Sequence, residues 1–204
     1  MDPTILVQRS PEWLQARCGS LGSSKASAAT ATLKRGGGAT KEADDLAWEI
    51  AAERLTGQPA RRVNALQWGV DHEEEARDAY GFMTNAPLNQ VGLVPHPTII
   101  GAHASPDALI GDDGVLELKC PTSGVHLKWR SMGVVPEEHL EQIWMALACT
   151  ERQWCDFMSY DPRFLEPRLQ TFVVRVERDA SIIKAFEERV RKFIKTVDQR
   201  VAAA

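Results

Sequence analysis

The chain has 204 residues, of which 44% are hydrophobic and 25% are charged, and its net charge is −4. This length is enough for a substantial core, and we expect one domain spanning residues 1–204. The acidic charge excludes a polybasic coat, but it does not exclude nucleic acid, because binding depends on where Lys and Arg gather. No apolar run approaches the ~20 residues that span a bilayer, and the first residues lack a signal-peptide pattern. The sequence therefore predicts a cytoplasmic protein without membrane contact.

Helices and turns dominate the first part of the sequence. Ser10-Pro11 predicts a helix start, because Ser caps a helix and Pro suits its first turn. A Ser/Gly turn over residues 19–27 leads into an Ala-rich helix, and further helices are expected over 41–55 and 64–83. The glycines at 36–38 are not followed by Gly-Lys-Ser/Thr, which argues against a phosphate loop and against ATP use.

Strands and helices alternate in the second part of the sequence. Strands are expected between residues 92 and 120, at 154–160 and at 171–176, and helices at 123–131, 136–149 and 180–201. This pattern predicts an α/β fold in which helices flank a central mixed β-sheet on both sides.

The most informative stretch is Ser105-Pro106-Asp107 and the strand at 115–120 that follows it. Side chains alternate between the two faces of a strand, so Glu117 and Lys119 point the same way. The turn before this strand places Asp107 and Glu117 on the two strands of one hairpin. Two carboxylates and an ammonium then converge, which is the minimal set for metal-dependent cleavage of a phosphodiester.

This triplet of Asp, Glu and Lys is weak evidence on its own. Chance alone gives on the order of 0.4 such triplets in a chain of this length. The alternative is a solvent-facing strand with an exposed Glu and Lys. Other candidate residues have similar alternatives when each is taken alone: Arg17 as a helix-end charge, Ser24 as a cap, Gln142 as a surface amide and Glu73 as a solvated glutamate.

Several separated motifs, taken in order, resemble the phage lambda exonuclease family of alkaline exonucleases over about residues 8–200. They are Ser105-Pro106-Asp107, Leu116-Glu117-Leu118-Lys119-Cys120-Pro121, Tyr160-Asp161-Pro162-Arg163, Trp13 with Arg17 and Gly19, Trp68-Gly69 with Glu73 and Ala76, Gln142, and Glu177-Arg178-Asp179. The resemblance implies the restriction-endonuclease-like core of the PD-(D/E)xK nucleases. It also implies an ATP-independent enzyme that degrades one strand of duplex DNA from its 5′ end and leaves a 3′ overhang for recombination. The implied assembly is a homotrimeric ring, and the implied partner is a single-strand annealing protein.

The resemblance also implies roles for individual residues, carried over by position. Asp107 and Glu117 match metal-binding carboxylates, and Lys119 matches a catalytic lysine. Glu73 matches a further acidic residue of the catalytic site that would also supply oxygen to an ion, and Leu118 lends its carbonyl oxygen to an ion. The residues that match a pocket for the DNA 5′-phosphate are Arg17, Ser24, Ser105 and Gln142. Lys34 or Arg35 matches a basic residue that draws the 5′ strand inward.

The implied cofactor is Mg²⁺, which prefers oxygen ligands, and Mn²⁺ is expected to substitute for it. Two ions would bracket the scissile phosphate. Lys119 is expected to orient or deprotonate the attacking water, and burial near cations is expected to lower its pKa. Two rivals remain on the same fold: a small endonuclease and a non-catalytic protein that binds DNA ends.

Overall fold

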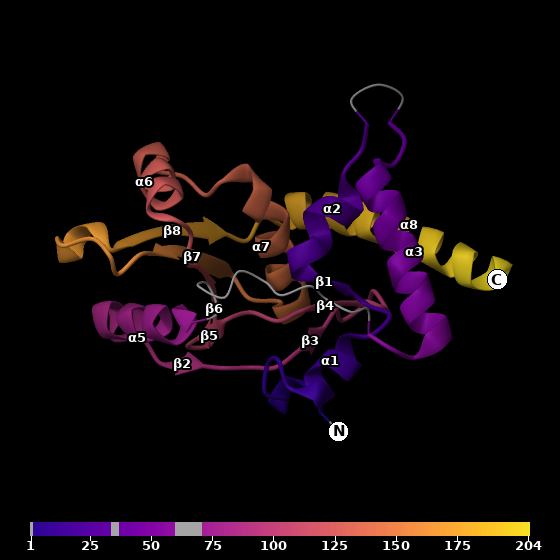
Figure 1. Cartoon of the computed structure of the whole chain (residues 1–204), viewed down its shortest axis with the longest axis horizontal. Coiled ribbons are helices and arrows are strands. Elements are labelled where there is room, and N and C mark those ends of the chain that lie inside the picture. Colours follow the sequence, from indigo (N-terminus) through magenta and orange to yellow (C-terminus); the bar gives the residue numbers. More distant parts are fainter. Residues whose placement is uncertain (1, 34–36, 60–70) are drawn as a thin grey trace.

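The computed structural model describes residues 2–33, 37–59 and 71–204 and contains two β-sheets (Figure 1). The larger sheet has five strands in the order β2-β5-β6-β7-β8, and the smaller sheet has three in the order β1-β4-β3. The strands of the larger sheet are Leu88–Asn89, Ala108–Ile110, Gly114–Lys119, Trp154–Tyr160 and Thr171–Glu177. Those of the smaller sheet, in the order given, are Leu21–Gly22, Ala102–Ala104 and Val94–Pro95.

Strand β6 is the centre of the larger sheet and carries the candidate catalytic residues. It pairs antiparallel with β5, with Leu116 opposite Ala108, and parallel with β7, with Lys119 opposite Ser159. Strand β8 then pairs antiparallel with β7. The sheet is therefore mixed, as the sequence predicts.

Helices cover both faces of this sheet. On one face, Val115 and Phe157 pack in the main core with side chains of α7 (Glu137–Thr150) and α8 (Ala180–Ala203). On the other face, Leu116 and Met158 pack in a second cluster with α5 (Glu73–Thr84). Figure 1 shows α5 on one side of the larger sheet and α6 (Ser123–Met132) with α7 on the other. The predicted layered α/β class is confirmed.

The N-terminal helices surround the smaller sheet. Short helix α1 (Pro11–Arg17) starts where predicted, because Ser10 accepts a hydrogen bond from the backbone N–H of Trp13. Helices α2 (Ala26–Thr30) and α3 (Lys41–Thr56) pack with α8 in the main core. Gly57 ends α3 in the left-handed conformation that glycine adopts without strain.

Two expectations need adjustment. The strands do not form one central sheet, because the chain bends at Ser105-Pro106, between β4 of the smaller sheet and β5 of the larger one. The helix expected over 64–83 is described only from its later part, where α5 runs to Thr84, and residues 60–70 lie outside the described range. Within the described ranges, no helix is long and apolar enough to cross a bilayer.

Candidate active site

Asp107 lies at the bend between the two sheets and is bound to β6 in two ways. Its backbone N–H donates to the carbonyl oxygen of Leu116 at 3.2 Å. Its carboxylate oxygen Oδ2 accepts the backbone N–H of Leu118 at 2.6 Å. The carboxylate therefore lies beside β6 just past the end of its pairing with β5. This placement is the reason for a Pro at the bend, where no ladder hydrogen bond is required of it.

Glu117 and Lys119 share one face of β6, as the strand alternation predicts. The Lys119 ammonium Nζ lies 2.5 Å from Glu117 Oε1, and the side chain of Glu117 is only 4% exposed. The alternative of a solvent-facing strand is therefore wrong. Gln142 of α7 completes the group, because its amide nitrogen donates to Glu117 Oε1 at 2.5 Å and its amide oxygen accepts from Lys119 at 3.2 Å.

Burial and mutual repulsion shape the electrostatics of this site. Burial, together with the negative charges of Glu117 and Glu73, raises the pKa of Asp107 well above its usual value. Burial alone would lower the pKa of Lys119, but the carboxylates of Glu117 and Asp107 outweigh burial and raise that pKa. The neighbours of Lys119 in this arrangement are acidic, and the lowering expected beside bound cations stays a prediction. Lys119 is an ammonium group at neutral pH.

Glu73 begins α5 and is linked to Asp107 through Arg77, which contacts both residues. Its carboxylate forms ion pairs with Arg9 and, at 3.2 Å, with Arg77. Neither arginine is among the site residues predicted from the sequence. The position of Arg77 one helical turn after Glu73 was a usable signal. No sequence signal links Arg9 to Glu73, because Arg9 comes from a separate part of the chain.

The residues present fit a divalent cation with oxygen ligands. The N–H of Leu118 faces Asp107, and the N–H and C=O of one strand residue point to the same side, so the Leu118 carbonyl also faces this carboxylate. Asp107, Glu117 and this carbonyl would be the ligands, since hard cations such as Mg²⁺ take oxygen donors. Among the described residues, no three His, Cys, Asp or Glu side chains lie close enough together to hold a metal ion by themselves. The proposed site does not require three such side chains, because one of its ligands is a backbone carbonyl.

The candidate phosphate residues Arg17 and Ser105 lie at the smaller sheet. The Arg17 guanidinium stacks over the ring of Trp13 at 4.1 Å, and Trp13 is held by a 2.9 Å hydrogen bond to the carbonyl of Gly92. A side chain at position 22 would lie only 2.8 Å from Arg17 Nη2, so Gly22 leaves room for this arginine. The hydroxyl oxygen of Ser105 is buried and has no hydrogen-bond partner among the described residues.

The remaining predicted residues fall in different places. Ser24 is exposed on the short 3₁₀ helix Ser23–Lys25, which packs against α7 and β4. Gln142 lies with Glu117 and Lys119, at the centre of the site. Lys34 and Arg35 lie outside the described residues.

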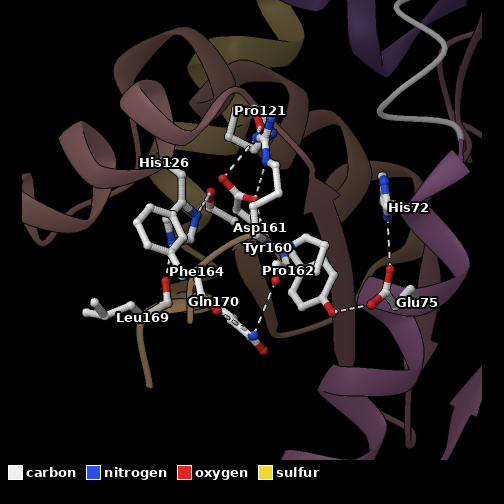
Figure 2. Close-up of polar contacts among 12 residues, drawn as sticks. His72, Glu75, Pro121, His126, Tyr160, Asp161, Pro162, Phe164, Leu169 and Gln170 are labelled. Atoms are coloured by element: carbon white, nitrogen blue, oxygen red, sulfur yellow. Dashed lines mark hydrogen bonds and ion pairs between the residues drawn. The ribbon is translucent and has the colours of Figure 1, made fainter. Parts of the chain in front are cut away.

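The motif Tyr160-Asp161-Pro162-Arg163 ties the end of β7 to neighbouring segments of the chain (Figure 2). Arg163 binds both oxygens of Asp161, at 2.7 and 2.9 Å, and donates to the carbonyl of Pro121 at 3.1 Å. Tyr160 donates its hydroxyl to Glu75 at 2.9 Å, which ties the end of β7 to the start of α5. The motif therefore fixes the chain that leaves Lys119 and the helix that carries Glu73.

The motif Glu177-Arg178-Asp179 is also structural. Arg178 donates to the carbonyl of Leu147 at 2.5 Å, and Asp179 caps α8 by accepting from Ser181 and Ile182. Neither contact involves the cluster around Asp107. This motif therefore supports the resemblance in fold and gives no information on the catalytic residues.

Comparisons with known proteins bear on the family and the fold of the chain. The model of the YqaJ-like viral recombinase domain matches residues 12–153. The crystal structure of an alkaline exonuclease, LHK-Exo, from Laribacter hongkongensis is 35% identical over 95% of both chains, with a TM-score of 0.86. A second structure, of LHK-Exo in complex with dAMP, is 34% identical over 95% of both chains, with a TM-score of 0.87.

A phage-related exonuclease from Haemophilus somnus 129PT shares the fold, with 16% identity, a TM-score of 0.67, and coverage of 90% of this chain and 96% of that one. None of the curated proteins compared matches the chain. The family model covers well over half of the sequence, and it agrees with the resemblance found from the motifs. The chain belongs to the YqaJ-like viral recombinase family and has the fold of the alkaline exonucleases.

Proposed function

We propose that this protein is a Mg²⁺-dependent, ATP-independent exonuclease that degrades one strand of linear duplex DNA in the 5′-to-3′ direction. The observation that carries the proposal is the convergence of Asp107, Glu117 and Lys119 on one edge of β6, with Gln142 bound to two of them. A binding protein has no need to gather two carboxylates and a lysine around one buried glutamate. Membership of a family that includes structures of exonucleases supports the nuclease class.

Each side chain has a distinct part in the proposed reaction. A bound divalent cation would supply polarisation of water and phosphate. Asp107, Glu117 and the Leu118 carbonyl would hold it. Lys119, as an ammonium group, would orient the attacking water and offset the charge that develops on the phosphate. Gln142 would hold Glu117 and Lys119 in register through its amide.

The direction of degradation would come from recognition of a 5′-phosphate. Arg17 suits this role because a guanidinium binds phosphate oxygens in pairs, and its stacking on Trp13 holds it in place. The buried hydroxyl of Ser105, which has no partner within the described ranges, offers a further donor, and Ser24 and Gln142 would add others. The product would be a 3′ overhang, which suits a family named for recombination and a single-strand annealing protein as partner.

The rival endonuclease differs from this proposal in its need for an end. We would incubate the protein and Mg²⁺ with supercoiled circular plasmid and with the same plasmid after linearisation. The proposal predicts that the linear form is degraded and the circular form is untouched. Nicking or linearisation of the circle would favour the endonuclease. Retention of linear DNA without cleavage would favour the non-catalytic end-binding protein.

A further inference from the structure

Arg77 connects three segments of the site through one guanidinium group. Its Nε donates to the backbone carbonyl of Asp107 at 3.1 Å, and its Nη2 pairs with Glu73 at 3.2 Å. The side-chain amide of Gln90 faces this guanidinium, and its hydrogen bonds are satisfied when the amide oxygen points toward Arg77. In that orientation the oxygen accepts from Arg77 Nε and Nη2, both at 3.1 Å. The side chain of Arg77 is only 14% exposed. An arginine with so many fixed partners has a single conformation available to it.

The segment that Arg77 supports links the two sheets and is held on its other side by β6. Asp107 directly follows the bend at Ser105-Pro106, and β5 begins only at Ala108. Gln8 from the N-terminal segment adds a second brace, because its amide donates to the carbonyls of Val91 and Pro106, both at 2.9 Å. These contacts line a cavity of about 480 Å³ whose wall includes Arg9, Glu73, Arg77 and Asp107.

We infer that Arg77 is a positioning residue that holds the main chain of Asp107 and the carboxylate of Glu73 in one fixed arrangement for cation binding. The inference rests on the proposed function. The guanidinium fork matters more than its charge, because two divergent donors reach a carbonyl and a carboxylate at once. The positive charge of Arg77 would repel a cation and weaken its binding, whereas the positioning of the ligands would strengthen it. The two effects have opposite signs and can therefore be separated by measurement.

The test is Mn²⁺ binding to the protein without DNA, measured by isothermal titration calorimetry. Replacement of groups that orient metal ligands typically weakens metal binding by about 10–100-fold. We expect a Mn²⁺ dissociation constant at least ~10-fold higher for Arg77→Met, and a similar increase for Arg77→Lys, which keeps the charge and loses the fork. The half-maximal Mn²⁺ concentration for DNA degradation should rise in parallel.

Arg200→Met is the matched control. Arg200 has a side chain 12% exposed and binds both the carbonyl and the carboxylate of Asp44, so it makes the same kinds of contact. The C-terminal end of α8, the helix that carries Arg200, lies at the opposite end of the molecule from α5 (Figure 1). This variant should bind Mn²⁺ as the unchanged protein does. Thermal unfolding of both Met variants shows whether each is folded. If Arg77→Met does not fold, the Mn²⁺ binding of Arg77→Lys provides the test.

Three results would overturn the inference. Tighter or unchanged Mn²⁺ binding by Arg77→Met would show that repulsion by the Arg77 charge dominates. A Mn²⁺ dissociation constant for Arg77→Lys equal to that of the unchanged protein would show that the guanidinium fork is not needed. In either case the unchanged protein still binds Mn²⁺ and degrades DNA, so the proposed function stands. If the unchanged protein neither binds Mn²⁺ nor degrades linear DNA, the proposed function fails and the inference fails with it.

Discussion

At the scale of single residues, Lys119 offers the sharpest test of the chemistry. It is bonded to Glu117 and Gln142, and its raised pKa keeps it charged at neutral pH. We expect Lys119→Ala to lower kcat by ~10²-fold or more, because the water loses the group that orients it. Affinity for DNA ends should persist, since Arg17 and the cation ligands remain. Turnover and fluorescence-anisotropy binding measured on the same preparation test this, and near-normal turnover would remove Lys119 from the mechanism.

Arg17 sets the expected preference for 5′-phosphorylated ends. A charge-assisted hydrogen bond contributes about 1.5–3 kcal/mol, so Arg17→Ala should reduce the preference by roughly tenfold to a hundredfold. The measurement is the ratio of degradation rates on 5′-phosphate and 5′-hydroxyl duplexes of one sequence. Equal rates with the unchanged protein would refute the phosphate pocket, whatever the variant does.

Asp161 should make folding stability depend on acid pH. Burial alone would raise its pKa, but hydrogen bonds from Arg163 and Ser123 outweigh burial and lower the pKa to about 2. A carboxyl whose pKa is lower in the folded state stabilises the fold above its unfolded pKa, and this stability is lost as the pH falls toward 2. From the pKa shift, the contribution is about 2 kcal/mol.

The variant Arg163→Met should therefore unfold more easily than the unchanged protein near pH 6. The gap in free energy of unfolding should shrink as the pH falls from about 4 toward 2, the range between the unfolded and folded pKa values of Asp161. Urea unfolding at several pH values measures this gap. A gap that stays constant with pH would mean that Arg163 acts through packing and not through the charge of Asp161.

At the scale of elements, the sequence predicted most helices and long strands, because their apolar periods and caps are local signals. The cap at Ser10 and the stop at Gly57 are examples. Strand β1 has only two residues, and its pairing with β4 joins positions 81 residues apart, such as Leu21 and Ala102, so no local pattern could reveal it. The same holds for Arg9 beside Glu73. Spacing could place Glu117 with Lys119, but only the fold brings Gln142 to them and Arg77 to the main chain of Asp107.

The register of β6 against β7 depends on Gly114. Trp154 lies opposite it, and a Cβ at position 114 would lie 2.2 Å from the indole ring. We expect Gly114→Ala to lower the free energy of unfolding by about 1–3 kcal/mol, the usual cost of overpacking. Gly124→Ala is the control, because a Cβ there meets nothing within 4 Å and alanine favours the helix α6 that contains it. Equal stability of the two variants in urea unfolding would contradict this account of the register.

At the scale of the whole molecule, we propose a closed homotrimer around the DNA. A chain of 204 residues with a net charge of −4 offers little surface to retain DNA through many cuts, and a ring would retain it by topology. Such a ring needs two different surfaces on each subunit to meet with a closing rotation. Light scattering at micromolar concentration should give three times the chain mass of 22.6 kDa. A stable monomer that still degrades long DNA without dissociating would contradict the ring.

The central claim is the polarity of degradation, and one digestion tests it directly. Linear duplex DNA with a 5′-phosphate at each end is labelled internally near one 5′ end or near one 3′ end and incubated with the protein and Mg²⁺, without ATP. The account predicts early release of mononucleotides from the 5′-proximal label, while the 3′-proximal label stays in a long single strand. Early release of the 3′-proximal label, or a requirement for ATP, would contradict the account.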